Sequence, residues 1–197
     1  MLRRTSACAL AAAAAATLSL AGGLPAASAS TTAAPADAAP APQAATTITY
    51  NASRAAQYEA EIEAGVAVWN DSVANVRIVE AAPGQRAEIT IIATTGWPQA
   101  TLGPVRPGGT ARVEMGSQAV AEGHDVTRIA AHELGHSLGL PDIKPGPCSS
   151  LMSGSTAGTS CTNAVPNATE RSRVERNYGT GALGAAPAAG TMVVDGP

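Results

Sequence analysis

The segment from His132 to Asp142 constrains the chain more than any other, and it reads His-Glu-Leu-Gly-His-Ser-Leu-Gly-Leu-Pro-Asp. A helical turn takes about 3.6 residues, so His132 and His136 lie on one face of a helix and can bind the same metal ion. Gly139 and Pro141 are residues that end a helix, and the turn after them can return Asp142 to that ion. The segment therefore predicts a helix, a sharp break and a metal site with three protein ligands.

Three protein ligands leave one coordination position of a zinc ion open, as in catalytic zinc sites and unlike structural ones. Glu133 follows the first ligand, where its carboxylate can reach a water on the metal instead of the metal itself. A carboxylate in that position serves as the general base when a peptide bond is hydrolysed. The motif therefore predicts a zinc-dependent endopeptidase in which Glu133 is the catalytic residue.

The third ligand is the position for which the sequence leaves alternatives. The broad pattern His-Glu-x-x-His-x-x-Gly-x-x-His ends in histidine, whereas this chain has Asp142. A carboxylate oxygen binds zinc at roughly 2.0–2.2 Å, close to the range of an imidazole nitrogen, so we expect Asp142 to be the third ligand. The alternatives are that Asp142 only forms the turn beside Pro141, or that His124, the remaining histidine, takes its place.

The signature His-Glu-x-x-His-x-x-Gly-x-x-Asp resembles that of the snapalysin family, which comprises small secreted neutral proteases of bacteria and belongs to the metzincins. The resemblance extends over residues 46 to 180 and is weakest from 81 to 118. The segments that carry it outside the signature are 49–53, 69–77, 146–154, 160–163 and 170–174.

The resemblance implies an α+β fold with a metzincin-like mixed, twisted sheet, an active-site helix and a second long helix. A short C-terminal lobe would hold a terminal helix and a Met-turn, with Met152 beneath the zinc ion. The resemblance also implies that the endopeptidase favours an aromatic residue just after the cut. Finally, it implies a calcium ion held by Asp125 and Thr127, although a helix N-cap alone would also explain Asp125.

The N-terminus has the layout of a secretory signal peptide. Arg3 and Arg4 precede an apolar run over residues 7–21, and Ala27-Ser28-Ala29 offers a small-x-small cleavage site. The run is short for a helix that spans a bilayer. We therefore expect residues 1–29 to be removed, and the protein to be secreted and to have no membrane partner after export.

The rest of the chain divides into three parts. Residues 30–45 consist mainly of Ala, Pro and Thr, which cannot bury enough apolar surface to become ordered, and we expect a propeptide or linker there. Residues 46–180 are expected to form a single zinc metalloprotease domain. Residues 181–197 return to Ala, Gly and Pro, and are expected to be a flexible tail in which residues 191–194 could form a short extended piece.

Two cysteines remain after removal of the signal peptide, which contains Cys8. Cys148 and Cys161 are expected to form a disulfide bond, because the environment outside the cell is oxidising. The loop that this bond closes would enclose Met152.

The segments around the motif predict helices and strands. A helix capped by Ser53 is expected to bury Trp69, and Asp125 is expected to open the active-site helix. Thr169 is expected to cap a last, mostly solvent-facing helix that includes Glu170. We expect the strand at residues 110–115 to be an edge strand that binds substrate. Runs of β-branched residues predict strands at 47–51, 76–79, 88–93 and 110–115.

Charge limits the partners that the protein can have. The net charge is −3, and no basic patch stands out beyond residues 171–176, which argues against a nucleic-acid partner. We expect protein or peptide substrates and a monomer. Lys144 stands where the resembling proteases often have tyrosine, and we expect its ammonium group to be solvated; the alternative is that it stabilises an oxyanion. The competing function is a secreted zinc-binding protein without activity, which would have no need of Glu133 as a base.

Overall fold

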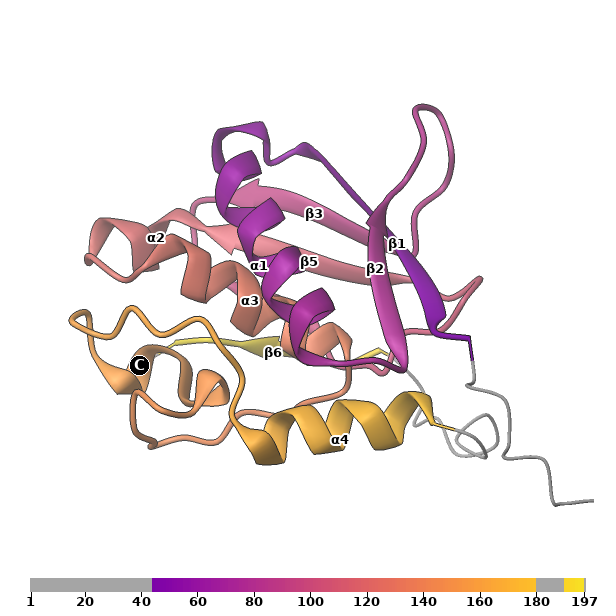
Figure 1. The fold of residues 1–197 in the computed structure, drawn as a ribbon. Helices are drawn as coiled ribbons and strands as arrows, with labels where there is room; N and C mark the ends of the chain where they lie inside the picture. Colours follow the sequence, from indigo (N-terminus) through magenta and orange to yellow (C-terminus); the bar gives the residue numbers. More distant parts are fainter. Residues whose placement is uncertain (1–43, 180–189, 197) are drawn as a thin grey trace, which may run out of the picture. The chain divides into compact units, whose positions relative to one another are not determined.

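The computed structural model describes residues 44–179 and 190–196. The expected signal peptide over residues 1–29, and all but the end of the linker over 30–45, lie outside that part of the chain. Within it, six strands form one sheet in the order β2-β1-β3-β5-β4-β6, and helices pack against this sheet (Figure 1).

The sheet is mixed, as the resemblance implied. β1 pairs in parallel with β2 and β3, and β3 pairs in parallel with β5, whereas β4 is antiparallel to both β5 and β6. Isoleucines at alternate positions, such as Ile89 and Ile91 of β3, are fully buried and form the core under the helices. The strands are β1 (Thr46–Arg54), β2 (Val76–Glu80), β3 (Ile89–Thr94), β4 (Gln99–Thr101), β5 (Ala111–Gly116) and β6 (Met192–Val194).

The predicted α+β class, with an active-site helix, a second long helix and a terminal helix, is confirmed. In the described residues, no helix is both long enough and apolar enough to cross a membrane. The helices are α1 (Glu59–Ser72), α2 (Ser117–Ala121), α3 (Val126–Ser137) and α4 (Ala168–Tyr178), with 3₁₀ helices at Ala56–Tyr58 and Leu151–Ala157.

Helix α1 crosses α3 at close range, and the crossing holds α3 in place (Figure 1). A Cβ atom on Gly65 of α1 would lie only 3.0 Å from the backbone nitrogen of Ala131 in α3. Trp69 is fully buried one turn further on, and its indole N–H donates to the Ala131 carbonyl at 2.7 Å. The predicted core position of Trp69 is therefore confirmed. Because α3 carries both histidines of the motif, these contacts also position the candidate site.

The helix that was expected to start at Ser53 starts later, at Glu59. β1 continues through Arg54. Ser53 donates its backbone N–H and its hydroxyl to Asn51 Oδ1, at 3.1 and 2.7 Å, instead of capping a helix. The side chain of Ser53 therefore satisfies a local bond at the end of a strand, which is a competing use of serine.

One expectation about the sheet was wrong. The strand expected at residues 110–115 is β5, which lies between β3 and β4 and is therefore not an edge. Within the tail over 181–197, the short extended piece expected at 191–194 contains β6, which pairs with β4; residues 180–189 and 197 lie outside the described part. The edge was misassigned because β4 and β6 have three residues each, too few to show the alternation by which a strand is recognised.

Glu88 ties the start of β3 to its neighbours. Its carboxylate accepts hydrogen bonds from the N–H and the hydroxyl of Thr49 in β1, and from the N–H of Gly108 at 3.0 Å. Burial by itself raises the pKa of Glu88, but the hydrogen bonds from Thr49 and Gly108 outweigh it and lower the pKa to about 2. The ionised form of Glu88 is therefore favoured in the folded protein.

A carboxyl with a lowered folded pKa stabilises the fold above its unfolded pKa and loses that effect as the pH falls towards the folded value. We expect Glu88→Gln to lower the free energy of unfolding by about 1–2 kcal/mol at pH 7. The difference from wild type should shrink between pH 4.5 and pH 2. Urea unfolding across this range measures it, with the exposed Glu63→Gln as the matched control. A difference that is constant with pH would contradict the assignment.

Candidate metal centre

Helix α3 places three residues of the motif in the interior. It begins after the N-cap Asp125, whose carboxylate accepts the N–H of Arg128 at 2.8 Å, as the sequence predicted. His132, Glu133 and His136 are all buried. The two imidazole rings lie with their centroids 4.6 Å apart and nearly perpendicular, so the four-residue spacing does bring them together.

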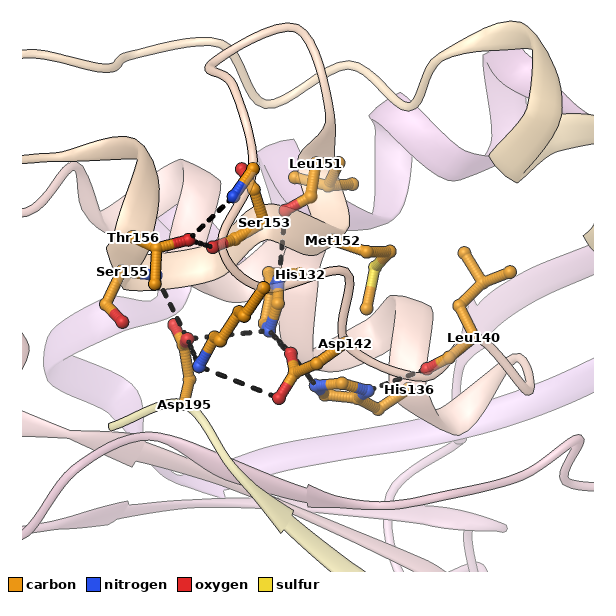
Figure 2. Close-up of polar contacts among 12 residues, drawn as sticks. His132, His136, Leu140, Asp142, Leu151, Met152, Ser153, Ser155, Thr156 and Asp195 are labelled. Atoms are coloured by element: carbon orange, nitrogen blue, oxygen red, sulfur yellow. Dashed lines mark hydrogen bonds and ion pairs between the residues drawn. The ribbon is translucent and has the colours of Figure 1, made fainter. Parts of the chain in front are cut away.

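The break after α3 depends on Gly139. This residue has φ of +94°, and a Cβ there would lie 2.6 Å from Asn177 Nδ2 and 2.9 Å from the nitrogen of Pro104. Only glycine combines that backbone conformation with such close neighbours. The chain therefore turns sharply at this point, and Asp142 returns to the face of α3 that carries the histidines (Figure 2).

The side chains of His132, His136 and Asp142 converge on one point (Figure 2). The two Nε2 atoms lie 3.0 Å apart, and Asp142 Oδ1 lies 3.3 Å from His132 Nε2 and 3.4 Å from His136 Nε2. Ligands at roughly 2.0–2.1 Å around a tetrahedral zinc ion would be about 3.3 Å apart. The separations of the three donor atoms therefore fit one zinc ion.

The hydrogen bonds of the imidazoles point to the same conclusion. Nδ1 of His132 lies 2.9 Å from the Leu151 carbonyl, and Nδ1 of His136 lies 2.7 Å from the Leu140 carbonyl. Each Nδ1 must carry a proton to donate to its carbonyl, so in the neutral rings both Nε2 atoms present lone pairs. Two lone pairs facing each other at 3.0 Å repel unless a proton or a metal ion lies between them. The donor set therefore suits a metal ion.

The protonation of the histidines and of Asp142 reflects this crowding. Burial by itself lowers the pKa of His132, but Asp142, Asp195 and Glu133 raise it to about 9. The pKa of His136 is lowered, mainly by burial. Burial raises the pKa of Asp142, but the two imidazoles outweigh it and hold that pKa well below its ordinary value. Without a metal ion, a proton on His132 therefore balances the ionised carboxylate of Asp142, and a metal ion bound at this point would take the place of that proton.

Glu133 belongs to the same cluster of buried side chains. It is fully buried, and neither of its carboxylate oxygens has a hydrogen-bond partner among the described residues. Burial raises the pKa of Glu133 well above its ordinary value. A buried carboxyl group without partners is costly, which indicates that the site is built for a bound group that Glu133 would contact.

Met152 lies under this cluster, where the resemblance placed it. It belongs to the 3₁₀ segment Leu151–Ala157 and is fully buried. A Cβ on Gly135, which lies between the two histidines on α3, would be 2.8 Å from the sulfur of Met152. Figure 2 shows the Met152 side chain next to the imidazoles. The predicted bond between Cys148 and Cys161 is confirmed, and it closes a loop with a sequence separation of 13 that encloses Met152.

Two charged residues hold the Met152 segment, and sequence reasoning missed both. The guanidinium of Arg128 in α3 donates to the Ser150 and Leu151 carbonyls and to the Ser153 hydroxyl. From the other side, Glu170 accepts from the segment. Its four donors are the Ser150 hydroxyl and the N–H groups of Leu151, Met152 and Asn167.

The expected solvent-facing position of Glu170 was therefore wrong, since only 2% of this residue is exposed. The N-cap of α4 was also misplaced: it is Asn167, not Thr169, and it forms a capping box with Glu170. The Asn-x-x-Glu spacing was the signal that could have identified both residues.

We expect Glu170→Gln to lower the free energy of unfolding by about 2–3 kcal/mol. The amide would turn an N–H₂ group towards N–H donors, leaving buried polar groups unpaired. Urea unfolding measures the loss, with Glu63→Gln as a control in which the same change is made on an exposed residue. If both variants had equal stability, Glu170 would not anchor the Met152 segment.

The remaining candidate residues lie outside the donor cluster. His124, the rival ligand, packs its ring edge against Trp97, with centroids 6.1 Å apart, and is not in either of the candidate metal groups of the described residues. Asp125 is occupied as the N-cap of α3, and Thr127 follows in its first turn. The calcium ion that the resemblance implies at Asp125 and Thr127 stays a prediction.

Lys144 and Asp195 form an ion pair at the edge of the cluster. The expectation that Lys144 is solvated was wrong: its side chain is 17% exposed, and Nζ lies 2.5 Å from Asp195 Oδ1 and 3.6 Å from Asp142 Oδ2. Asp195, which sequence reasoning did not consider, has Oδ1 3.9 Å from His132 Nε2. With His132 and Glu133 it makes a second group of donor atoms that lie close together.

Comparison with known proteins gives a family. The model of the family described as Streptomyces extracellular neutral proteinase (M7) matches residues 45–181. Relatives named extracellular small neutral protease occur in Streptomyces sp. (strain C5), 40% identical over 153 residues, and in Streptomyces coelicolor, 39% identical over 142 residues. The matches cover 70% and 72% of this chain, and 58% and 64% of the two relatives.

The chain therefore spans about three fifths of the length of those two relatives. A third relative, the extracellular small neutral protease of Streptomyces caespitosus, is 38% identical over 150 residues, and the match covers 98% of it. Among solved structures, the chain is similar to high choriolytic enzyme 1, a hatching enzyme zinc-protease from the medaka fish Oryzias latipes. That similarity has 23% identity and a TM-score of 0.36 over 49% of this chain and 44% of the other, so it assigns no function.

Proposed function

Because the chain belongs to the Streptomyces extracellular neutral proteinase (M7) family, we propose that it is a secreted, zinc-dependent endopeptidase. The observation that carries the proposal is the triangle of donor atoms from His132, His136 and Asp142, with the unpartnered carboxylate of Glu133 beside it. The names of the relatives, which are extracellular proteases, support the same function and location.

His132, His136 and Asp142 would hold the zinc ion. Zinc in such a site lowers the pKa of water and polarises the carbonyl group of the bond to be cut. The protein supplies the orientation of the ligands: the Leu151 and Leu140 carbonyls fix the two imidazoles through Nδ1, which leaves Nε2 of each ring for the metal. Met152, which is fully buried, lies against α3 at Gly135, between the two histidines in sequence.

Glu133 is the general base and general acid in this proposal. Its carboxylate takes a proton from the attacking water and delivers it to the nitrogen that leaves with the second half of the substrate. Burial favours the protonated form of Glu133, as its raised pKa indicates. A carboxyl group that holds a proton readily is suited to carry it between these two steps.

The substrates are proteins or peptides. An extended peptide can bind by adding a strand to the edge of a sheet, and in this sheet β4 follows β5 and has its other edge paired with β6. The preference for an aromatic residue just after the cut follows from the family resemblance. Next to Asp142, the residues Leu140, Pro141 and Ile143 line a pocket whose other walls are Met152 and the α4 residues Thr169, Glu170 and Arg173.

Casein hydrolysis by the purified chain tests the proposal. We expect cleavage that a zinc chelator abolishes and that one equivalent of zinc restores. Peptides with Phe or Tyr after the cut should be cleaved faster than the same peptides with Ala at that position. Zinc binding without any cleavage would contradict the proposal and leave a zinc-binding protein without activity.

A further inference from the structure

The C-terminal segment Thr191–Gly196 lies along the outer edge of β4. Within it, β6 pairs with β4 in antiparallel register, with Val194 opposite Gln99 and Met192 opposite Thr101. Two further backbone bonds continue the ladder, from the Leu102 N–H to the Thr191 carbonyl and from the Asp195 N–H to the Pro98 carbonyl, each at 2.8 Å. This is how an extended peptide adds to a sheet, so the chain's own end takes the edge that a substrate would need.

At the end of β6, the side chain of Asp195 turns into the candidate metal centre (Figure 2). Only 3% of Asp195 is exposed. Its Oδ1 accepts the N–H of Ser155 at 3.0 Å and lies 2.5 Å from Lys144 Nζ. The same atom is 3.9 Å from His132 Nε2. The segment therefore reaches the centre with a carboxylate, and that carboxylate is held by two donors.

The place that Asp195 occupies is shaped for a carboxylate. Gly154 has φ of +50°, and a Cβ there would lie 2.1 Å from Asp195 Oδ1, so any other residue at position 154 would fill the space. Lys144 and Ser155 also bind the backbone next to the carboxylate: Lys144 Nζ and the Ser155 hydroxyl donate to the Gly196 carbonyl, at 3.1 and 2.9 Å. The ammonium group of Lys144, the N–H of Ser155 and the missing side chain at Gly154 together favour a negatively charged group at this position.

We propose that Gly154, Ser155 and Lys144 form a carboxylate-binding site beside the metal centre, and that the chain's own Asp195 fills it. The segment Thr191–Gly196 then competes with substrate for the edge of β4 and acts as a built-in inhibitor. The inhibition rests on the proposed endopeptidase function, whereas the carboxylate site does not. Because both partners belong to one chain, a tethered segment acts at an effective concentration on the order of millimolar, which lets even a weak contact suppress activity.

The first test compares the full chain, the chain ending at Gly190, and the full-length variants Asp195→Ala and Val194→Thr. Val194 belongs to the same strand but is 53% exposed, so its variant is the matched control. We expect truncation and Asp195→Ala each to raise kcat/KM for a casein peptide at least about tenfold, and Val194→Thr to leave it unchanged. Equal activity of all four proteins would overturn the inhibition. Should the truncated chain fail to fold, Asp195→Ala decides the question alone.

The second test measures binding without catalysis. A labelled synthetic peptide with the sequence Thr-Met-Val-Val-Asp-Gly-Pro is titrated onto two proteins, and binding is followed by fluorescence anisotropy. The two proteins are the chain ending at Gly190 and the full-length variant Asp195→Ala. Binding is expected, and we expect it to weaken at least about tenfold when the peptide carries Asn for Asp or when the protein carries Lys144→Met. Absence of binding, or equal binding of the Asp and Asn peptides, would overturn the carboxylate site.

The two tests separate the two proposals. Peptide binding in proteins that never cleave casein would contradict the endopeptidase function and support the carboxylate site. Cleavage that is equal with and without the C-terminal segment, together with no peptide binding, would support the function and overturn the inference.

Discussion

Replacement of Glu133 by glutamine is expected to lower kcat/KM for casein peptides by a factor of about 10²–10⁴, with one zinc ion still bound per chain. A positioned general base contributes roughly this factor to proton transfer, and glutamine cannot accept the proton. The fold should tolerate the change, because Glu133 has no hydrogen-bond partner among the described residues and its raised pKa shows that burial favours an uncharged side chain.

Steady-state kinetics and metal analysis on the same preparation measure both halves of this expectation. Glu63→Gln is the control, since it makes the same chemical change on an exposed part of α1. The chain ending at Gly190 should be compared as well, so that an effect of the C-terminal segment is not mistaken for one of Glu133. Activity within tenfold of wild type would contradict the role of Glu133 as the base.

Replacement of Asp142 by alanine is expected to weaken zinc binding more than 100-fold. Loss of an outer partner of a metal ligand typically costs 10- to 100-fold in affinity, and Asp142 supplies one of the three converging donor atoms itself. Competition with a chromophoric chelator measures the change. His124→Ala is the control, because His124 packs against Trp97 outside the donor cluster and should leave the affinity unchanged.

Asp195 needs a control of its own in this experiment. Its carboxylate forms a second candidate group with His132 and Glu133, so it could take the place of a missing Asp142. The Asp142→Ala variant is therefore made both in the full chain and together with Asp195→Ala. An unchanged zinc affinity in the double variant, or equal losses from Asp142→Ala and His124→Ala, would contradict the assignment of Asp142 as the third ligand.

The metal centre was largely predictable because its residues lie within 11 positions of each other. Helical spacing places His132 and His136 together, and Gly139 makes the turn that returns Asp142. The parallel strands β1, β2, β3 and β5 were predictable for a related reason, since each is long enough to show a run of β-branched residues. Local patterns specify these features, and such patterns can be read from one sequence.

The contacts that surround the centre were not predictable, because they join distant segments. Glu170 and Arg128 are charged residues on helices, which are usually exposed, and their buried partners lie about 20 positions away. Lys144 and Asp195 are 51 positions apart and meet only because β6 adds to β4. A three-residue strand in an Ala, Gly and Pro-rich tail has no pattern that would predict such pairing.

Anomalous X-ray diffraction at the zinc edge, from crystals of the zinc-loaded full chain, tests the central claim most directly. The account predicts one anomalous peak, at roughly 2.0–2.2 Å from His132 Nε2, His136 Nε2 and an oxygen of Asp142. No further ligand should come from residues 44–179, and Glu133 should lie beside the open position without binding the metal. A peak held by other residues, or one enclosed by four ligands from that part of the chain, would contradict it.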